Sequence, residues 1–177
     1  RDSSTSHGLG DVYKRQVFKE AVVMQMTWPG APTVYYGDEA GVCGFTDPDN
    51  RRTYPWGHED KELIDFHKAA IKMHKENEVL RTGSYKQLYS AHNVIAYGRF
   101  TSDDAVIVVV NNGEDEIRVN IPAWETGLAM DDDVEQIMVT FEGGYSTDRQ
   151  GYRLKDGILN IGLRKTSATV LRRLRSV

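Results

Sequence analysis

The fold of this chain is decided by residues 29–56, which read PGAPTVYYGDEAGVCGFTDPDNRRTYPW. A short apolar run, Thr33 to Tyr36, ends at Gly37 and is followed by a glycine-rich, acidic loop that carries Asp47 and Arg51. This order is typical of a buried parallel strand that leads into a ligand-facing loop. We therefore expect a short strand at residues 33–36 and a binding loop directly after it.

Two motifs in this stretch are specific enough to indicate a family. Tyr-Tyr-Gly-Asp-Glu begins at Tyr35, and Gly-x-x-Asp-Pro-Asp-Asn-Arg-Arg begins at Gly44, with Trp56 nearby. In this order they resemble the eighth strand and following loop of the alpha-amylase family of glycoside hydrolases, most of all its neopullulanase, maltogenic amylase and cyclomaltodextrinase group. The resemblance implies an α/β fold followed by an all-β domain: the last helix, strand and helix of a (β/α)₈ TIM barrel, then an antiparallel β-sandwich.

Helical periodicity flanks the motifs on both sides. Apolar residues at helical spacing begin at Val17 and stop before Pro29, which cannot continue a helix. A second amphipathic helix is expected over residues 61–77, with Asp60 as its N-cap. If the resemblance holds, these are the seventh and eighth barrel helices, and residues 17–83 are the C-terminal part of the catalytic barrel.

From Ser84 onward the apolar period changes from helical spacing to alternation, which predicts strands. Short turn-forming stretches such as Lys155-Asp156-Gly157 separate them. The pattern predicts an antiparallel β-sandwich over residues 84–177. The eight expected strands are Ser84 to Tyr89, Val94 to Phe100, Ala105 to Asn111, Glu116 to Ile121, Val134 to Thr140, Tyr152 to Lys155, Ile158 to Leu163 and Ala168 to Arg173.

The first sixteen residues are excluded from this fold prediction. Asp11 to Gln16 resembles the translation of a transposase recognition end used in sequencing libraries, and residues 1–10 have no apolar period. We expect residues 1–16 to be a non-native, unpacked leader. A natural flexible N-terminal arm is the alternative.

Composition narrows the possible partners. The 177 residues carry a net charge of −4, which gives no basic field for nucleic acid. No apolar run is long enough to cross a membrane, and the single cysteine excludes an internal disulfide. We expect no membrane partner, no metal and no cofactor. A cytoplasmic parent protein is favoured, although its compartment stays open because its true N-terminus is expected to lie outside this sequence.

The resemblance also implies that the catalytic carboxylates lie outside this chain. The family's third catalytic aspartate follows asparagine and histidine, and none of the five histidines here precedes an aspartate. A retaining glycosidase needs one carboxylate as nucleophile and another as acid and base. We therefore expect a C-terminal fragment that contains no catalytic residue and does not hydrolyse glycosides alone.

Asp47 and Arg51 are the candidate substrate-binding residues. A carboxylate accepts hydrogen bonds from sugar hydroxyls, and a guanidinium donates several in a fixed fork. By resemblance, they hold glucose units on the non-reducing side of the cleaved bond. The alternative is an ion pair that only fixes the loop.

Two aromatic residues complete the expected site. Phe45 and Trp56 are flanked by polar loop residues and could offer faces on which a glucose ring packs. Asp38 and Glu39 are adjacent, so their side chains point apart and a structural role is expected. Three consecutive residues, His58 to Asp60, cannot wrap one metal ion.

The sequence thus predicts a fragment of a retaining alpha-glycosidase. Its substrates would be alpha-1,4 and alpha-1,6 linked glucans such as maltodextrin, cyclodextrin or pullulan. A glucanotransferase parent is one alternative, because hydrolysis and transfer differ at acceptor sites that this chain lacks. A non-catalytic, glucan-binding or structural β-sandwich module is another.

Overall fold

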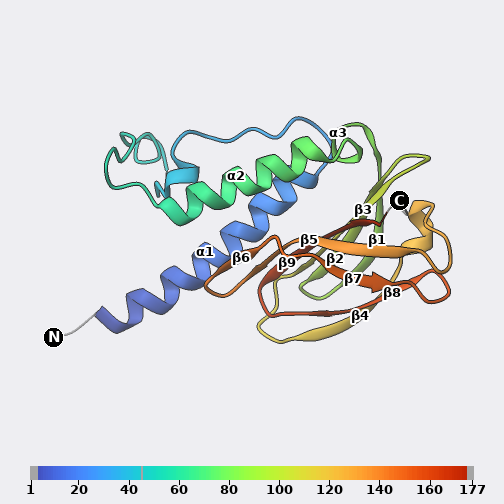
Figure 1. Ribbon diagram of the computed structural model, residues 1–177. Helices are drawn as coiled ribbons and strands as arrows, with labels where there is room; N and C mark the ends of the chain where they lie inside the picture. Colours follow the sequence, from blue (N-terminus) through green and yellow to red (C-terminus); the bar gives the residue numbers. More distant parts are fainter. Residues whose placement is uncertain (1–3, 45, 175–177) are drawn as a thin grey trace.

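The computed structural model describes the backbone of residues 4–44 and 46–174, with side chains from Lys14 onward. Helices come first along the chain and strands second (Figure 1). The helices are α1 (Ser4–Thr27), the 3₁₀ helix η1 (Asp38–Ala40), α2 (Lys61–Glu76), the short α3 (Val79–Thr82) and a second 3₁₀ helix, η2 (Ala123–Thr126). The two long helices expected from the apolar periodicity are thus confirmed.

The strands follow the expected alternation closely. All eight predicted strands are present, and a short ninth strand, β6, was not predicted. They are β1 (Ser84–Ala91), β2 (Val94–Phe100), β3 (Ala105–Asn111), β4 (Ile117–Pro122), β5 (Asp133–Phe141), β6 (Gly144–Ser146), β7 (Gln150–Arg153), β8 (Ile158–Leu163) and β9 (Ser167–Arg173). β7 begins two residues earlier than predicted, at Gln150 rather than Tyr152.

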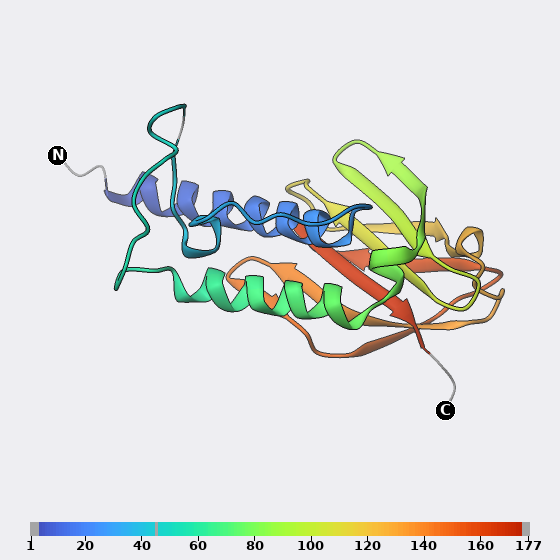
Figure 2. The ribbon, with the colours of Figure 1, turned by 90° about the horizontal axis from the view of Figure 1, so that it is seen from above.

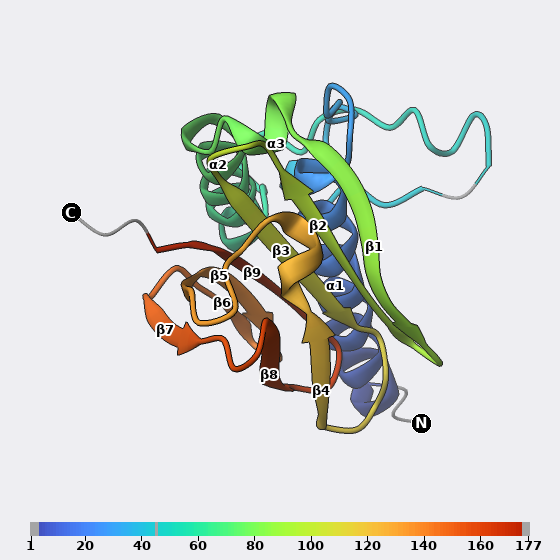
Figure 3. The same ribbon diagram turned by 90° about the vertical axis from the view of Figure 1, so that its right-hand side faces the viewer.

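The strands form two antiparallel sheets of unequal size. The large sheet has seven strands in the order β1-β2-β3-β9-β5-β6, with β7 also pairing with β5. The small sheet consists of β4 and β8 alone. Figure 3 shows β4 and β8 in front of the large sheet and α1 behind it. The sandwich is therefore unequal, and its small sheet covers only part of the large one.

The large sheet is buried on both faces. Every residue of β3 is buried, including Val108 and Val109, whose side chains point to opposite faces. One face packs against α1, α2 and α3 through residues such as Val23 and Phe66, with Val108 on the sheet side. The other face, which carries Val109, packs against Ile161 of the small sheet. The chain thus has three layers: helices, a large sheet and a small sheet (Figures 1 and 2).

The expected strand at Thr33 to Tyr36 is wrong: residues 31–35 take no regular structure. A parallel strand exists only where neighbouring strands satisfy its backbone. In the ranges that the structure describes, this segment has no neighbouring strand, and the Thr33 carbonyl instead accepts a hydrogen bond from Gln25 Nε2. The structure therefore shows the two helices expected of a barrel end but no barrel strand.

The expected leader is not set apart from the fold. α1 begins at Ser4, and residues 1–3 lie outside the described ranges. Gln16 is buried, and its Nε2 donates a 2.7 Å hydrogen bond to the carbonyl of Thr166. Residues 11–16 contain no proline or glycine, so nothing in them stops the helix that packs from Val17 onward. The expectation of an unpacked segment is thus wrong at Gln16, while the non-native origin of residues 1–16 stays a prediction.

Arg99 on β2 joins the sheet to the ends of two helices. Its side chain is 1% exposed. Nη1 donates to the carbonyls of Thr27 and Leu80, each at 2.9 Å, and Nη2 donates to that of Gly83 at 2.8 Å. These carbonyls lie at or near the C-terminal ends of α1 and α3, where intrahelical donors run out and the helix dipole is negative. Burial lowers the pKa of the Arg99 guanidinium below its usual value.

The last turn of α1 receives further polar contacts. The Tyr97 hydroxyl lies 2.6 Å from Thr27 Oγ1, and His74 Nδ1 on α2 lies 2.7 Å from the carbonyl oxygen of Met26. Trp28 packs edge-on against the Tyr97 ring, with centroids 5.2 Å apart. Helices α1 and α2 and the large sheet therefore meet at one point, the C-terminal turn of α1.

We predict that Arg99→Met lowers the free energy of unfolding by about 3 kcal/mol or more, because it leaves buried carbonyls without donors. Arg99→Lys should recover only part of this loss, since a single ammonium cannot reproduce the planar fork. Urea denaturation of each variant measures the effect. Arg153→Met, which changes an exposed arginine of β7, is the control and should cost little; equal losses in the two methionine variants would contradict the anchoring role.

Glu20 on α1 is a buried carboxylate. It is 3% exposed, and its Oε1 has no hydrogen-bond partner among the residues that the structure describes. It lines a cleft of about 380 Å³ between α1 and the strands β1, β2 and β3. Burial disfavours the charged carboxylate and raises the pKa of Glu20 from 4.5 to about 8. The folded protein therefore holds this proton more tightly than the unfolded chain does.

The Glu20 contribution to stability should fall as the pH rises from about 4.5 to about 8, because the folded state must then release the proton that it favours. Glu20→Gln stays neutral, so the variant should match wild type near pH 4, below both pKa values, and exceed it by about 1 kcal/mol or more at pH 9. Urea denaturation at both pH values measures this difference. Glu76→Gln, at an exposed carboxylate, is the control; a wild-type pH dependence retained in Glu20→Gln would exclude the assignment.

Candidate functional site

The candidate binding loop spans residues 41–60 and projects beyond the two long helices (Figure 2). Its start and end are tied together by a 3.0 Å hydrogen bond from the Asp60 amide to the Ala40 carbonyl. The Tyr36 hydroxyl donates to the carbonyl of Arg52 at 2.8 Å. At Gly44 the loop folds back on itself, since a Cβ there would lie 2.5 Å from the Asn50 Cα. The glycine is therefore required by close backbone approach.

Asp47 and Arg51 meet in this loop. Arg51 Nε lies 2.6 Å from Asp47 Oδ1, and Arg51 Nη2 donates to Asp47 Oδ2 at 3.0 Å. Both side chains are more than half exposed, at 66% for the aspartate and 61% for the arginine. The bidentate contact fixes the guanidinium plane and leaves its remaining N–H groups facing solvent. The structure thus contains the ion pair of the alternative interpretation, in a position that a ligand can reach.

A second ion pair stands next to the first. Arg52 donates to Asp49 Oδ1 through Nη2 at 2.6 Å and through Nε at 3.0 Å, again on the surface. Trp56 is 79% exposed and packs against the Tyr54 ring, with centroids 4.6 Å apart. Phe45, the fourth expected site residue, lies outside the described residues. The loop therefore offers an aromatic face and two charge pairs to solvent.

The tyrosines at the start of the motif differ from expectation. In a buried strand at residues 33–36 both tyrosines would lie in the core, but Tyr35 and Tyr36 are 49% and 45% exposed. The missing strand explains this, because no sheet forms around them. The Tyr36 hydroxyl instead donates to the Arg52 carbonyl and holds the loop.

Two neighbouring acidic residues, Glu39 and Glu59, accept backbone amides of the loop. Glu39 Oε2 accepts the Gly37 amide at 3.0 Å, and Glu59 Oε1 accepts the Gly57 amide at 3.0 Å. The Glu59 backbone contacts lower the pKa of its carboxyl group. Burial raises the pKa of Asp38, and the adjacent Glu39 charge adds to this effect. The carboxylates of Glu39 and Glu59 therefore fix the turns at Gly37 and Gly57.

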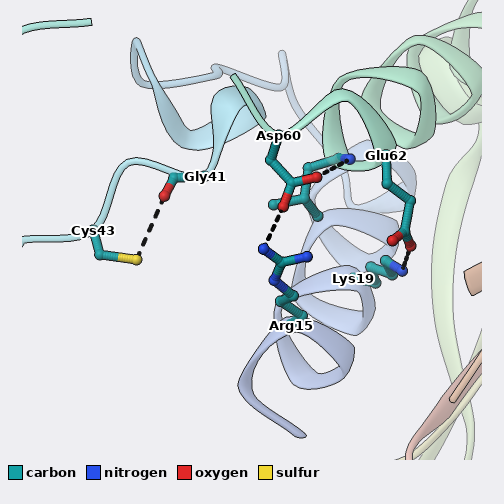
Figure 4. Close-up of polar contacts among 7 residues, drawn as sticks. Arg15, Lys19, Gly41, Cys43, Asp60 and Glu62 are labelled. Atoms are coloured by element: carbon teal, nitrogen blue, oxygen red, sulfur yellow. Dashed lines mark hydrogen bonds and ion pairs between the residues drawn. The ribbon is translucent and has the colours of Figure 1, made fainter. Parts of the chain in front are cut away.

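Asp60 closes the loop and starts α2. Its Oδ1 accepts the Leu63 amide at 3.2 Å, which confirms the expected N-cap. Its Oδ2 lies 2.7 Å from Arg15 Nη2 on α1 (Figure 4). Figure 4 also shows the contact between Lys19 and Glu62 one turn further along. A cleft of about 400 Å³ opens here between α1, η1 and α2, with Cys43 on its wall.

Two other classes of feature are absent from the described residues. No group of three or more histidine, cysteine, aspartate or glutamate side chains is arranged to hold a metal ion there. None of the helices in the described ranges is long and apolar enough to span a membrane.

Known proteins give a consistent comparison, although no protein-family model matches the chain. It is 41% identical to an amylopullulanase from Thermoanaerobacterium saccharolyticum over 134 residues, which are 68% of this chain and 10% of that protein. It is 43% identical to a cyclomaltodextrinase from Thermoanaerobacter pseudethanolicus over 96 residues, 53% of this chain and 17% of that protein. A cyclomaltodextrin glucanotransferase from Klebsiella oxytoca is 25% identical over 122 residues, 64% of this chain and 19% of that protein. The chain thus spans less than a fifth of each of these relatives.

Solved structures share the fold. An alpha-amylase from Anoxybacillus superposes with a TM-score of 0.76 at 24% identity, covering 92% of this chain and 33% of that chain. A cyclomaltodextrinase gives a TM-score of 0.66 at 27% identity, covering 92% of this chain and 26% of that chain. The family resemblance read from residues 29–56 is thereby confirmed.

We predict that Asp60→Ala lowers the free energy of unfolding by about 1 kcal/mol or more, because it removes both the N-cap and the contact with Arg15. Chemical denaturation measures the loss. Asp65→Ala is the matched control, because Asp65 lies on the surface of α2 in a 3.6 Å pair with Lys68 and should contribute little. A loss no larger than that of the control would mean that the cap does not fix the loop.

Proposed function

We propose that this chain, a relative of the alpha-amylase family glycoside hydrolases, supplies part of the glucan-binding surface of a retaining alpha-glycosidase. The substrates would be alpha-1,4 linked and alpha-1,6 linked glucans such as maltodextrin, cyclodextrin or pullulan. The observation that carries the proposal is the exposed, bidentate Asp47–Arg51 pair. Relatives named amylopullulanase and cyclomaltodextrinase support the substrate class.

The pair suits a sugar ring because its geometry is set before the ligand arrives. The contact with Asp47 fixes the orientation of the Arg51 guanidinium. Its N–H groups that face solvent therefore lose little conformational entropy when a sugar hydroxyl binds. The outer carboxylate lone pairs accept hydroxyl protons at the same place. Neither residue attacks the sugar in this proposal. The nucleophile and the acid and base lie in the rest of the enzyme, and Asp47 and Arg51 orient a glucose unit away from the cleaved bond.

Two other functions fit parts of the same observations. The similarity to a cyclomaltodextrin glucanotransferase favours a transferase parent as the second candidate. The two parents differ in product: a hydrolase releases reducing ends, whereas a transferase conserves them. A non-catalytic, glucan-binding or structural module is the third candidate, and retention of the isolated chain on insoluble starch, without turnover of maltodextrin, would favour it.

We predict that Arg51→Ala lowers kcat/KM for long maltooligosaccharides. The loss of transition-state stabilisation should be about 1 to 3 kcal/mol, the range for deleting a charged hydrogen bond. The measurement requires residues 17–177 grafted onto a complete upstream barrel. For a substrate too short to reach Arg51, kcat/KM should hardly change, because such a substrate makes no contact with this residue.

Arg52→Ala is the matched control for this prediction. Arg52 forms the same kind of exposed pair with Asp49 one residue further along, so its loss would disturb the loop to a similar extent. Equal losses for long and short substrates, or equal losses in the two variants, would mean that Arg51 only braces the loop and would reject the proposed contact.

A further inference from the structure

A polar cleft of about 280 Å³ lies where the small sheet stops short of covering the large one. Within the small sheet β8 pairs with β4, and in the described residues its other edge, on the β5 and β7 side of the large sheet (Figure 3), is bridged only at Ile158, to Lys155. The floor of the cleft includes Gln136 and Thr169 from β5 and β9, and Tyr152 of β7 forms a side. Arg118 of β4 and Arg164, just after β8, complete the lining. The cleft is far in sequence from the binding loop and independent of the function proposed above.

The two arginines carry positive charge that the protein does not neutralise. Neither forms an ion pair with a carboxylate in the part of the chain that the structure describes. Arg118 Nη1 donates to the neutral amide oxygen of Asn160 at 2.6 Å, and the Arg164 guanidinium lies over the Phe141 ring, 4.9 Å from its centroid. No acidic side chain is among the described residues that line the cleft. In a chain of net charge −4, this cationic cleft is a local exception.

The neutral lining is buried and polar. Gln136 and Thr169 are only 8% and 4% exposed, and both line the cleft beside Val139. Burial raises the pKa of the Tyr152 hydroxyl, and the positive charge of Arg118 opposes this rise, as expected for a guanidinium close to the phenol. Amide, hydroxyl and phenol groups can each bond a sugar hydroxyl. The cleft thus combines charged donors with neutral hydrogen-bonding groups.

The absence of a side chain at Gly162 leaves room for the Arg118 guanidinium at the cleft. Gly162 lies opposite Arg118 in the β4–β8 ladder, and a Cβ on it would lie 3.4 Å from Arg118 Nη2. The guanidinium therefore lies directly over the bare backbone of β8. A large side chain at this position would occupy that path without requiring a different backbone conformation.

We propose that this cleft binds the phosphate group of a small phosphorylated sugar. Guanidinium forks match phosphate oxygens in geometry and charge, and two unpaired forks exceed what a neutral glucan requires. The neutral lining then takes the sugar hydroxyls. The volume lies at the lower end of the range for ligand pockets, which limits the ligand to about one sugar ring.

The test is a titration of the full chain followed by NMR, with inorganic phosphate, glucose 6-phosphate and maltose as separate probes. We expect saturable shifts of the Gly162 amide and the Tyr152 ring with glucose 6-phosphate, with a Kd on the order of 1 mM. Inorganic phosphate should bind the same residues several-fold more weakly, and maltose should not shift them. Raising the salt concentration should weaken the binding of both anions, because salt screens the charges of exposed arginines.

Variants assign the binding to the cleft. Arg118→Gln and Arg164→Gln should each weaken glucose 6-phosphate binding by about tenfold, as expected for loss of a charged hydrogen bond, and Gly162→Leu should do so without removing a charge. Arg153→Gln is the control, because Arg153 is an exposed arginine of β7 already paired with Asp131 and Asp133. No saturable shift in wild type, equal shifts with maltose, or unchanged binding in both cleft arginine variants would overturn the proposal.

Discussion

The burial of one cation governs how the layers of this protein fit together. Arg99 projects from the large sheet into the junction of α1 and α3, where water is excluded. A guanidinium in such a place is stable only if oxygen atoms replace its hydration. The carbonyls of Thr27, Leu80 and Gly83 do so from helix ends that carry partial negative charge. Neither helix can shift against β2 without leaving a buried charge unsatisfied, so their positions are fixed together.

The candidate site depends on that junction. Residues 28–60 leave the end of α1 and return to the start of α2, and both helices pack on the same face of the sheet. The loop between them is closed by the Asp60 amide on Ala40 and tied by Tyr36. Exposed ion pairs such as Asp47–Arg51 contribute little to stability. Their value lies in presenting a fixed fork to a ligand, which requires that both ends of the loop be held elsewhere.

The unequal sheets explain the second cleft. Helices cover one face of the large sheet, but β4 and β8 are too few to cover the other. Polar residues of β5, β7 and β9 therefore stay uncovered at the place where a third strand of the small sheet would lie. Polar residues such as Gln136 and Thr169 can remain there because the space above them is open to solvent and ligands.

Local patterns in the sequence determined the elements and the family of this protein. Alternation predicted the strands, helical spacing predicted α1 and α2, Asp60 was read as an N-cap, and the motifs at residues 29–56 indicated the relatives later found. These features succeed because each rests on neighbours within a few residues. Asp47 and Arg51 could likewise be placed in one loop because they lie four residues apart in the sequence.

Only the tertiary structure decided what depends on distant partners. Thr33 to Tyr36 read as a strand, but a strand requires neighbours that the segment itself does not encode. Arg99, in an alternating strand, gave no sign that it would be buried, because the carbonyls that it contacts all lie outside its own strand. Arg118 and Arg164 share a cleft only because β4 pairs with β8 at one register. Burial and charge convergence are properties of the packed layers, and no local stretch of sequence contains them.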